Sequence, residues 1–264
     1  MAVKLRTRAL MLLMRLFHHE RLTAWHARGL LRTPRGEVQI TGGPGVKLRL
    51  ARFAFWGAQA YGVITGEHER QVQEALRRTV AAGDVVWDVG ANIGMLSLVA
   101  ARMVGPDGHV VALEPDAQSA AAIRANAAAN GMTIDVREAA AAATTGEVEI
   151  IVVEDRLWTR LASVGEHDLE AERRTVQGVA LDDLDAPAPA LIKIDVEGAE
   201  LDVVAGMRRL LHDVKPAIVC EMHGKNAQFV AAMREAGYVV TNLDGPQPVE
   251  HADGNVHALC LPAA

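Results

Sequence analysis

The strongest constraint on the fold is a regular alternation of short apolar segments and helical segments that begins at residue 85. Seven apolar runs are predicted to be strands, and they lie at residues 85–89, 109–113, 133–137, 191–195, 216–221, 238–241 and 256–261. Helical segments lie between them, at residues 93–103, 116–129, 199–211 and 226–236. This alternation is typical of a parallel sheet that is covered by helices on both faces. We therefore expect an α/β fold whose ligands bind at the carboxyl ends of the strands.

The first 60 residues follow a different pattern, and we expect them to form an N-terminal extension to a main domain at residues 61–264. Residues 1–35 read as helical, and residues 37–56 alternate apolar and polar side chains. Such alternation predicts a β-hairpin, which would turn at residues 41–45. The extension is therefore predicted to be an amphipathic helix followed by a hairpin.

Residues 1–19 combine basic and apolar side chains, but their uninterrupted apolar run, residues 9–14, is too short to span a bilayer. No small-residue cleavage site follows, so a secretory signal is not expected. Such a helix docks on its own domain, on the second subunit of a homodimer, or on a membrane surface. We expect a cytoplasmic protein, because Cys220 and Cys260 lie in apolar runs and are interpreted as buried thiols rather than a disulfide. The net charge of −6 argues against nucleic acid as a partner.

The segment at the end of the first strand carries Asp88, Gly90, Asn92 and Gly94 at alternate positions. Glycines in a turn from strand to helix let the backbone approach a ligand closely, and the helix start offers free N–H groups. The spacing Asp-x-Gly-x-Asn-x-Gly differs from the Gly-x-Gly-x-x-Gly fingerprint of dinucleotide-binding folds. The turn therefore predicts a ligand site without a plain dinucleotide signature, and a tight turn with no ligand is the alternative.

The second strand ends in Glu114, which is followed by Pro115 and Asp116. Glu114 lies 20 residues beyond Gly94, the separation at which an acidic residue meets ribose hydroxyls in nucleotide-binding folds. We expect its carboxylate to accept hydrogen bonds from both hydroxyls, while Pro115 ends the strand. Asp116 is explained as well by a capping role at the next helix. Together, the glycine turn and the acidic strand end indicate a cofactor that contains adenosine.

Three segments of the chain resemble the FkbM-type S-adenosylmethionine-dependent methyltransferases: "VVWDVGANIG" (85–94), "VVALEPD" (110–116) and "LIKIDVEGAE" (191–200). The resemblance covers roughly residues 60–261. It implies the class I methyltransferase fold, a Rossmann-like, mostly parallel sheet of seven strands with the last strand antiparallel. It also implies methyl transfer, usually to a hydroxyl oxygen of a natural product, a glycan or a lipid-like acceptor.

The resemblance also implies roles for individual residues around the cofactor. The methionine side would be lined by the residues of the first turn, Asp88, Gly90, Asn92 and Gly94. Glu114, with Pro115 beside it, would hold the ribose, and Glu138 and Ala139 would flank the adenine. We also assign Asp195 to the cofactor site.

Chemistry at the acceptor needs further groups. The sulfonium is an activated methyl donor, so the protein chiefly aligns donor and acceptor, and a hydroxyl acceptor also needs a base or a cation. Asp195, Glu221 and His223 lie at adjacent strand ends and are the predicted catalytic residues. His223 can act as a base because its reference pKa lies near neutrality. The same three residues offer oxygen and nitrogen ligands for a divalent cation, but their spacing assigns no metal site.

Other polar residues near these strand ends can be explained without a role in catalysis. Glu197 and Glu200 lie at a helix start, where carboxylates favour the helix dipole. The remaining histidines are interpreted as surface or core residues.

A polar stretch at residues 154–174 lies inside a predicted extra strand pair at residues 148–181. Loops of this length are often functional lids. We expect it to help close the acceptor pocket with side chains such as Trp158, Arg160 and Ser163.

The leading hypothesis is an S-adenosylmethionine-dependent O-methyltransferase. A nicotinamide-dependent oxidoreductase is the rival enzyme, against which the spacing of the first turn and the "KIDVEGAE" segment both count. A cofactor-binding assembly subunit without turnover is the non-enzymatic rival.

Overall fold

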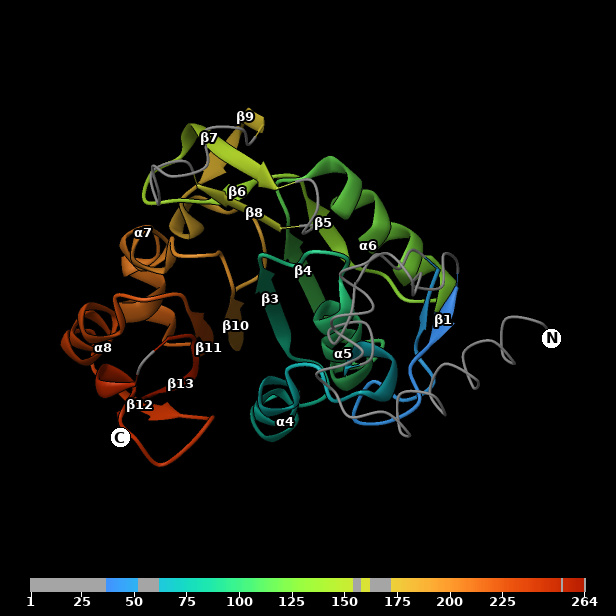
Figure 1. The fold of residues 1–264 in the computed structure, drawn as a ribbon, viewed down its shortest axis with the longest axis horizontal. Helices are drawn as coiled ribbons and strands as arrows, with labels where there is room; N and C mark the ends of the chain where they lie inside the picture. The colour runs from blue at the N-terminus through green and yellow to red at the C-terminus, as the bar shows by residue number, and fades with distance from the viewer. Residues whose placement is uncertain (1–36, 52–61, 154–157, 162–171, 253, 264) are drawn as a thin grey trace, which may run out of the picture.

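The computed structural model describes residues 37–51, 62–153, 158–161, 172–252 and 254–263. Within these segments, seven strands form one sheet in the order β12–β13–β11–β10–β3–β4–β5 (Figure 1). Their bounds are β3 (Val85–Val89), β4 (His109–Leu113), β5 (Asp135–Arg137), β10 (Leu191–Ile194), β11 (Ala217–Met222), β12 (Tyr238–Asn242) and β13 (Val256–Pro262). β13 runs opposite to the other six strands, which all run in the same direction. The predicted class I methyltransferase fold is confirmed.

Helices cover both faces of this sheet (Figure 1). The helices and short helical turns are α4 (Arg70–Thr79), α5 (Met95–Val104), α6 (Ala117–Ala129), η2 (Leu181–Asp183), α7 (Glu200–Ala205), η3 (Leu210–Val214), α8 (Asn226–Glu235) and η4 (Val249–His251). Successive strand residues point to opposite faces. Val86 and Leu191 pack with side chains of α4 and α5, whereas Trp87 and Ile192 pack with side chains of α7 and α8. The strands are therefore buried on both sides, as their continuous apolar sequences predict.

One helix is shorter than the sequence predicts. The predicted helix at residues 199–211 is divided, because α7 ends at Ala205 and a π-helical turn follows at Leu210–Val214. A Cβ atom on Gly206 would lie only 2.1 Å from the carbonyl oxygen of Ala142. The chain thus passes Ala142 at a distance that only glycine allows, and the prediction of a continuous helix is wrong.

A second sheet of four strands lies at the top of the view in Figure 1, in the order β6–β9–β7–β8. Its strands are β6 (Ala140–Ala141), β7 (Gly146–Val153), β8 (Trp158–Leu161) and β9 (Glu172–Val179). β7 and β9 are antiparallel, which confirms the strand pair predicted within residues 148–181. Most of the predicted lid, including Ser163, lies outside the described residues, whereas Trp158 and Arg160 belong to β8.

The predicted hairpin is present as β1 (Val38–Gln39) and β2 (Arg49–Leu50), with Val38 opposite Leu50. Its apolar side chains are buried in the same core cluster as α4 and α5. The predicted helix at residues 1–35, with its proposed membrane contact, lies outside the described residues. The division of the chain at residue 60 remains a prediction.

The two cysteines are free and buried, Cys220 on β11 and Cys260 on β13, as the sequence predicts. In the described segments, no helix is both long enough and apolar enough to cross a membrane.

Candidate active site

The turn after β3 has a left-handed backbone, with φ of +74° at Gly90, +51° at Asn92 and +80° at Gly94. A Cβ atom on Gly90 would lie 1.7 Å from the backbone oxygen of Asp195, just after β10. Gly90 is therefore required for packing where two strand ends meet, a reason that the sequence does not show, and its place beside a ligand remains a prediction. A Cβ atom on Gly94 would lie 3.0 Å from Ile123, so this glycine lets the turn pack against α6.

Glu114 follows β4 and is 5% exposed. Its two carboxylate oxygens accept hydrogen bonds from the backbone N–H groups of Asn92, at 2.8 Å, and Asp116, at 2.9 Å. Burial raises the pKa of Glu114 to about 7, because these hydrogen bonds offset only part of the lost hydration. Each carboxylate oxygen has a second lone pair, so the group can still accept hydrogen bonds from a ligand.

The residues on either side of Glu114 have different surroundings. Asp116 caps α6, as one of the two sequence interpretations predicts, and one of its oxygens lies 3.1 Å from Nη1 of Arg174 on β9. This ion pair connects the second sheet to the end of β4. Glu138, after β5, is exposed and forms an ion pair of 2.6 Å with an arginine of α6, whereas Ala139 is buried. A contact of Glu138 and Ala139 with adenine, or of Pro115 with the ribose, remains a prediction.

A buried ion pair connects β3 to β10. Lys193 on β10 lies opposite Asp88 on β3, and its Nζ is 3.2 Å from Oδ1 of that residue. The ammonium also lies 3.6 Å from Oδ2 of Asp195 and donates a hydrogen bond of 2.9 Å to the carbonyl oxygen of Gly90. Burial opposes the charge of Lys193, but the two carboxylates outweigh it and raise the pKa. Asp88 is held by Lys193 and by the hydroxyl of Ser97, so it positions the turn after β3 from inside the protein.

The structure brings the three predicted catalytic residues together. Nε2 of His223 lies 3.9 Å from Oδ1 of Asp195 and 3.6 Å from Oε1 of Glu221. Glu197 adds a third carboxylate, 3.4 Å from the same nitrogen. Glu200 is 1% exposed, and its Oε1 lies 2.9 Å from Nδ1 of His223. Glu200 therefore orients the histidine in addition to lying at a helix start.

Asp195, Glu197 and Glu221 are all partly buried around His223. Burial, reinforced by the neighbouring carboxylates and opposed by Lys193, raises the pKa of Asp195 to about 6. Burial likewise raises the pKa of Glu197 to about 7. For His223, burial lowers the pKa, but Glu200 and the nearby carboxylates outweigh it and raise the value to about 9. His223 is therefore protonated at neutral pH, in contrast to the near-neutral pKa expected from the sequence.

Two histidines that the sequence assigns to surface or core are partly buried and lie at this edge of the sheet. His257 lies opposite Glu221 in the register of β13 and β11, with Nε2 3.5 Å from Oε2 of that residue. His68 precedes α4, and its Nε2 lies 2.8 Å from Oε1 of Glu69. Burial opposes ionisation of Glu69, but the contact with His68 lowers its pKa to about 2. No local pattern in the sequence indicates either residue, because their places depend on how distant segments pack and pair.

A family model described as the methyltransferase FkbM domain matches residues 88–240, which is more than half of the 264 residues. The chain belongs to this family. The matched region begins at Asp88 and includes the residues around His223. Glu69 and His257 lie outside it.

Two relatives have names that state what they methylate. The hexuronic acid methyltransferase AglP of Haloferax volcanii is 29% identical over 161 residues, which is 59% of this chain and 62% of that protein. The 31-O-demethyl-FK506 methyltransferase FkbM of Streptomyces tacrolimicus is 30% identical over 198 residues, covering 62% of this chain and 76% of that protein. The chain thus spans less than two thirds of the length of AglP.

Solved structures with some likeness to this chain include an FkbM methyltransferase from Methylobacillus flagellatus KT, at 17% identity and a TM-score of 0.46. That match covers 76% of this chain and 53% of the other. A ribosomal protein L11 methylase from Lactobacillus delbrueckii subsp. bulgaricus matches at 15% identity and a TM-score of 0.48, covering 74% of this chain and 78% of the other.

Proposed function

We propose that this protein is an S-adenosylmethionine-dependent methyltransferase that methylates a hydroxyl oxygen of a small molecule, a glycan or a lipid-like acceptor. The observation that carries the proposal is the presence of two features at one edge of the sheet, on either side of the turn after β3. One is the buried Glu114 carboxylate beside the glycine turn. The other is the cluster of Asp195, Glu221 and His223. Family membership supports methyl transfer, and the names of AglP and FkbM support a sugar or natural-product acceptor.

The residues around Glu114 fit an adenosine-containing cofactor. The carboxylate is buried without full compensation for its lost hydration, which is the state that two ribose hydroxyl donors would relieve. We propose that Glu114 holds the ribose and that the turn from Gly90 to Gly94 lies along the methionine portion. When bound, S-adenosylmethionine supplies an activated methyl group.

In the proposed reaction, the acceptor oxygen forms a bond to the methyl carbon while the carbon–sulfur bond of the sulfonium breaks. The hydroxyl proton must then pass to a base. A protonated His223 cannot take it, so we propose Asp195 as the proton acceptor. Carboxylates with a raised pKa near neutrality suit this task. His223 and Glu221 would position the acceptor and balance the charge of the cluster.

A transfer assay with radiolabelled S-adenosylmethionine tests the proposal. Wild-type protein should label at least one acceptor in a panel of hydroxylated metabolites, sugars and lipids. Asp195→Asn should lower turnover by about 10²–10⁴-fold, the range for loss of general base catalysis, while it keeps affinity for S-adenosylhomocysteine. A protein that binds the cofactor but labels no member of the panel would favour the assembly subunit. Binding of NAD in place of S-adenosylhomocysteine would favour the oxidoreductase.

A further inference from the structure

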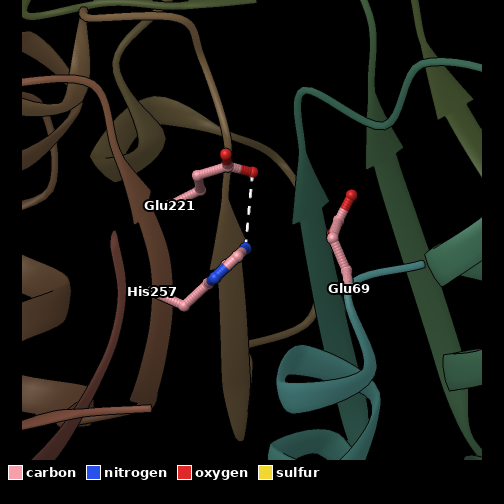
Figure 2. A group of neighbouring side chains, drawn as sticks. All are labelled: Glu69, Glu221 and His257. Carbon is pink, nitrogen blue, oxygen red and sulfur yellow. Dashed lines mark ion pairs between the residues drawn. The ribbon is translucent and has the colours of Figure 1, made fainter. Parts of the chain in front are cut away.

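A second group of possible ligands lies beside the proposed catalytic cluster, and it draws on three segments that are distant in sequence. Glu69 immediately precedes α4, Glu221 lies near the end of β11, and His257 lies near the start of β13. One donor atom from each lies within 4.8 Å of the other two. Figure 2 shows Glu221 and His257 joined by their ion pair, with Glu69 across from them at the start of the helix.

The orientation of His257 is an independent observation. Its Nδ1 lies 3.1 and 3.0 Å from the two carboxylate oxygens of Asp244, which fixes the ring. The other nitrogen, Nε2, is shielded from solvent and makes no hydrogen bond of good geometry in the described part of the chain. It points instead at Glu221. A histidine held at one nitrogen by a carboxylate, with the other directed at further ligands, is the usual arrangement at protein metal sites.

The separation of the two donors also suits an ion. Nε2 of His257 and Oε2 of Glu221 are 3.5 Å apart, which is too long for a good hydrogen bond. Two ligands bound about 2.1 Å from one tetrahedral ion lie about 3.4 Å from each other. The observed spacing is therefore close to that of two ligands that share a metal.

We propose that Glu69, Glu221 and His257 bind a divalent cation. Two carboxylates and one imidazole suit Mn²⁺ or Zn²⁺. Two of the three ligands lie outside the region that the family model matches.

The site has a consequence for the reaction, and this consequence rests on the proposed function. The other carboxylate oxygen of Glu221, Oε1, lies 3.6 Å from Nε2 of His223. One side chain therefore connects the cation site to the proposed catalytic cluster. A cation there would lie where it can bind the acceptor hydroxyl and lower its pKa.

Metal binding itself provides the test. Wild-type protein is treated with a chelator, desalted and titrated with Mn²⁺, and free Mn²⁺ is followed by electron paramagnetic resonance. We expect one bound ion per chain. Glu69→Gln and His257→Gln should each weaken binding by at least about 10-fold. Glu74→Gln, which changes a half-exposed carboxylate on α4 that pairs with Arg77, should leave binding unchanged. Asp244→Asn, which changes the carboxylate that holds the ring and the backbone N–H of His257, should weaken binding by about 10–100-fold.

Three results would overturn the proposal. The first is no binding of Mn²⁺ or Zn²⁺ to the wild-type protein. The second is wild-type affinity in Glu69→Gln or His257→Gln. The third is binding that depends on Asp195 and Glu197 instead, which would place the ion in the neighbouring group with His223. Affinity for S-adenosylhomocysteine is measured on every variant, so a failed metal site with intact cofactor binding leaves the methyltransferase proposal standing.

Discussion

Replacing Glu114 with glutamine removes the ionisable group from the proposed cofactor site and keeps the shape of the side chain. The carboxyl has a pKa of about 7 in the folded protein, against 4.5 as the ordinary value. The folded state therefore binds this proton more tightly than the unfolded state, and the wild-type protein gains stability as the pH falls below 7. Between pH 8 and pH 5.5, linkage gives a gain of about 2 kcal/mol in the free energy of unfolding. Glu114→Gln cannot titrate, so it lacks this gain.

The assay is urea unfolding of both proteins at pH 8 and pH 5.5, without ligand. The free energy of unfolding of the variant is subtracted from that of the wild type at each pH, which cancels the contribution of all other titrating groups. That difference should shift by about 2 kcal/mol in favour of the wild type at the lower pH. Glu235→Gln, an exposed carboxylate on α8, is the control and should show no such shift. A difference that is independent of pH would refute the reasoning about Glu114.

Cofactor binding should respond in the opposite direction. Ribose hydroxyls donate hydrogen bonds, so S-adenosylhomocysteine prefers the ionised carboxylate. If only that form binds, wild-type affinity should fall by about 30-fold between pH 8 and pH 5.5. At pH 8, Glu114→Ala should weaken binding by about 1.5–3 kcal/mol, the scale of a charge-assisted hydrogen bond. Unchanged affinity in a folded Glu114→Ala protein would remove Glu114 from the cofactor site.

Other substitutions test the framework of the site. Gly90→Ala should destabilise the protein by at least about 3 kcal/mol in thermal unfolding, because its Cβ would collide with the backbone of Asp195. Gly83→Ala, also at positive φ but with open space around it, should cost only about 1–2 kcal/mol, and equal losses would contradict this reading. Lys193→Met should destabilise the protein by about 3–5 kcal/mol in urea, because Asp88 would become a buried charge without this counter-charge. Stability like that of the wild type would show that Asp88 has another counter-charge.

The sequence was sufficient for the main sheet because each buried strand carries a continuous apolar run. It was also sufficient to bring Asp195, Glu221 and His223 together, because β10 and β11 are neighbours and parallel strands end at one edge. These predictions depend only on the spacing of apolar residues along the chain and on the order of the strands in the sheet.

Contacts between distant segments were not predicted. His257 reaches the site because β13 pairs with β11 in a register that sets it opposite Glu221, and a change of one residue would turn it to the other face. Glu69 reaches the site through the packing of α4. The pKa of His223 depends on carboxylates from several segments, so a reference value could not describe it. The break after α7 depends on the close approach of Gly206 to the backbone of Ala142. The spacing of apolar residues in the helical segment does not show this contact.

Calorimetric titration of the wild-type protein at pH 8 with S-adenosylhomocysteine, and separately with NAD, tests the central claim most directly. The proposal of a methyltransferase site at the ends of β3, β4 and β10 predicts one S-adenosylhomocysteine per chain and no measurable heat of binding with NAD. The absence of S-adenosylhomocysteine binding by a folded protein, or equal affinity for NAD, would contradict it.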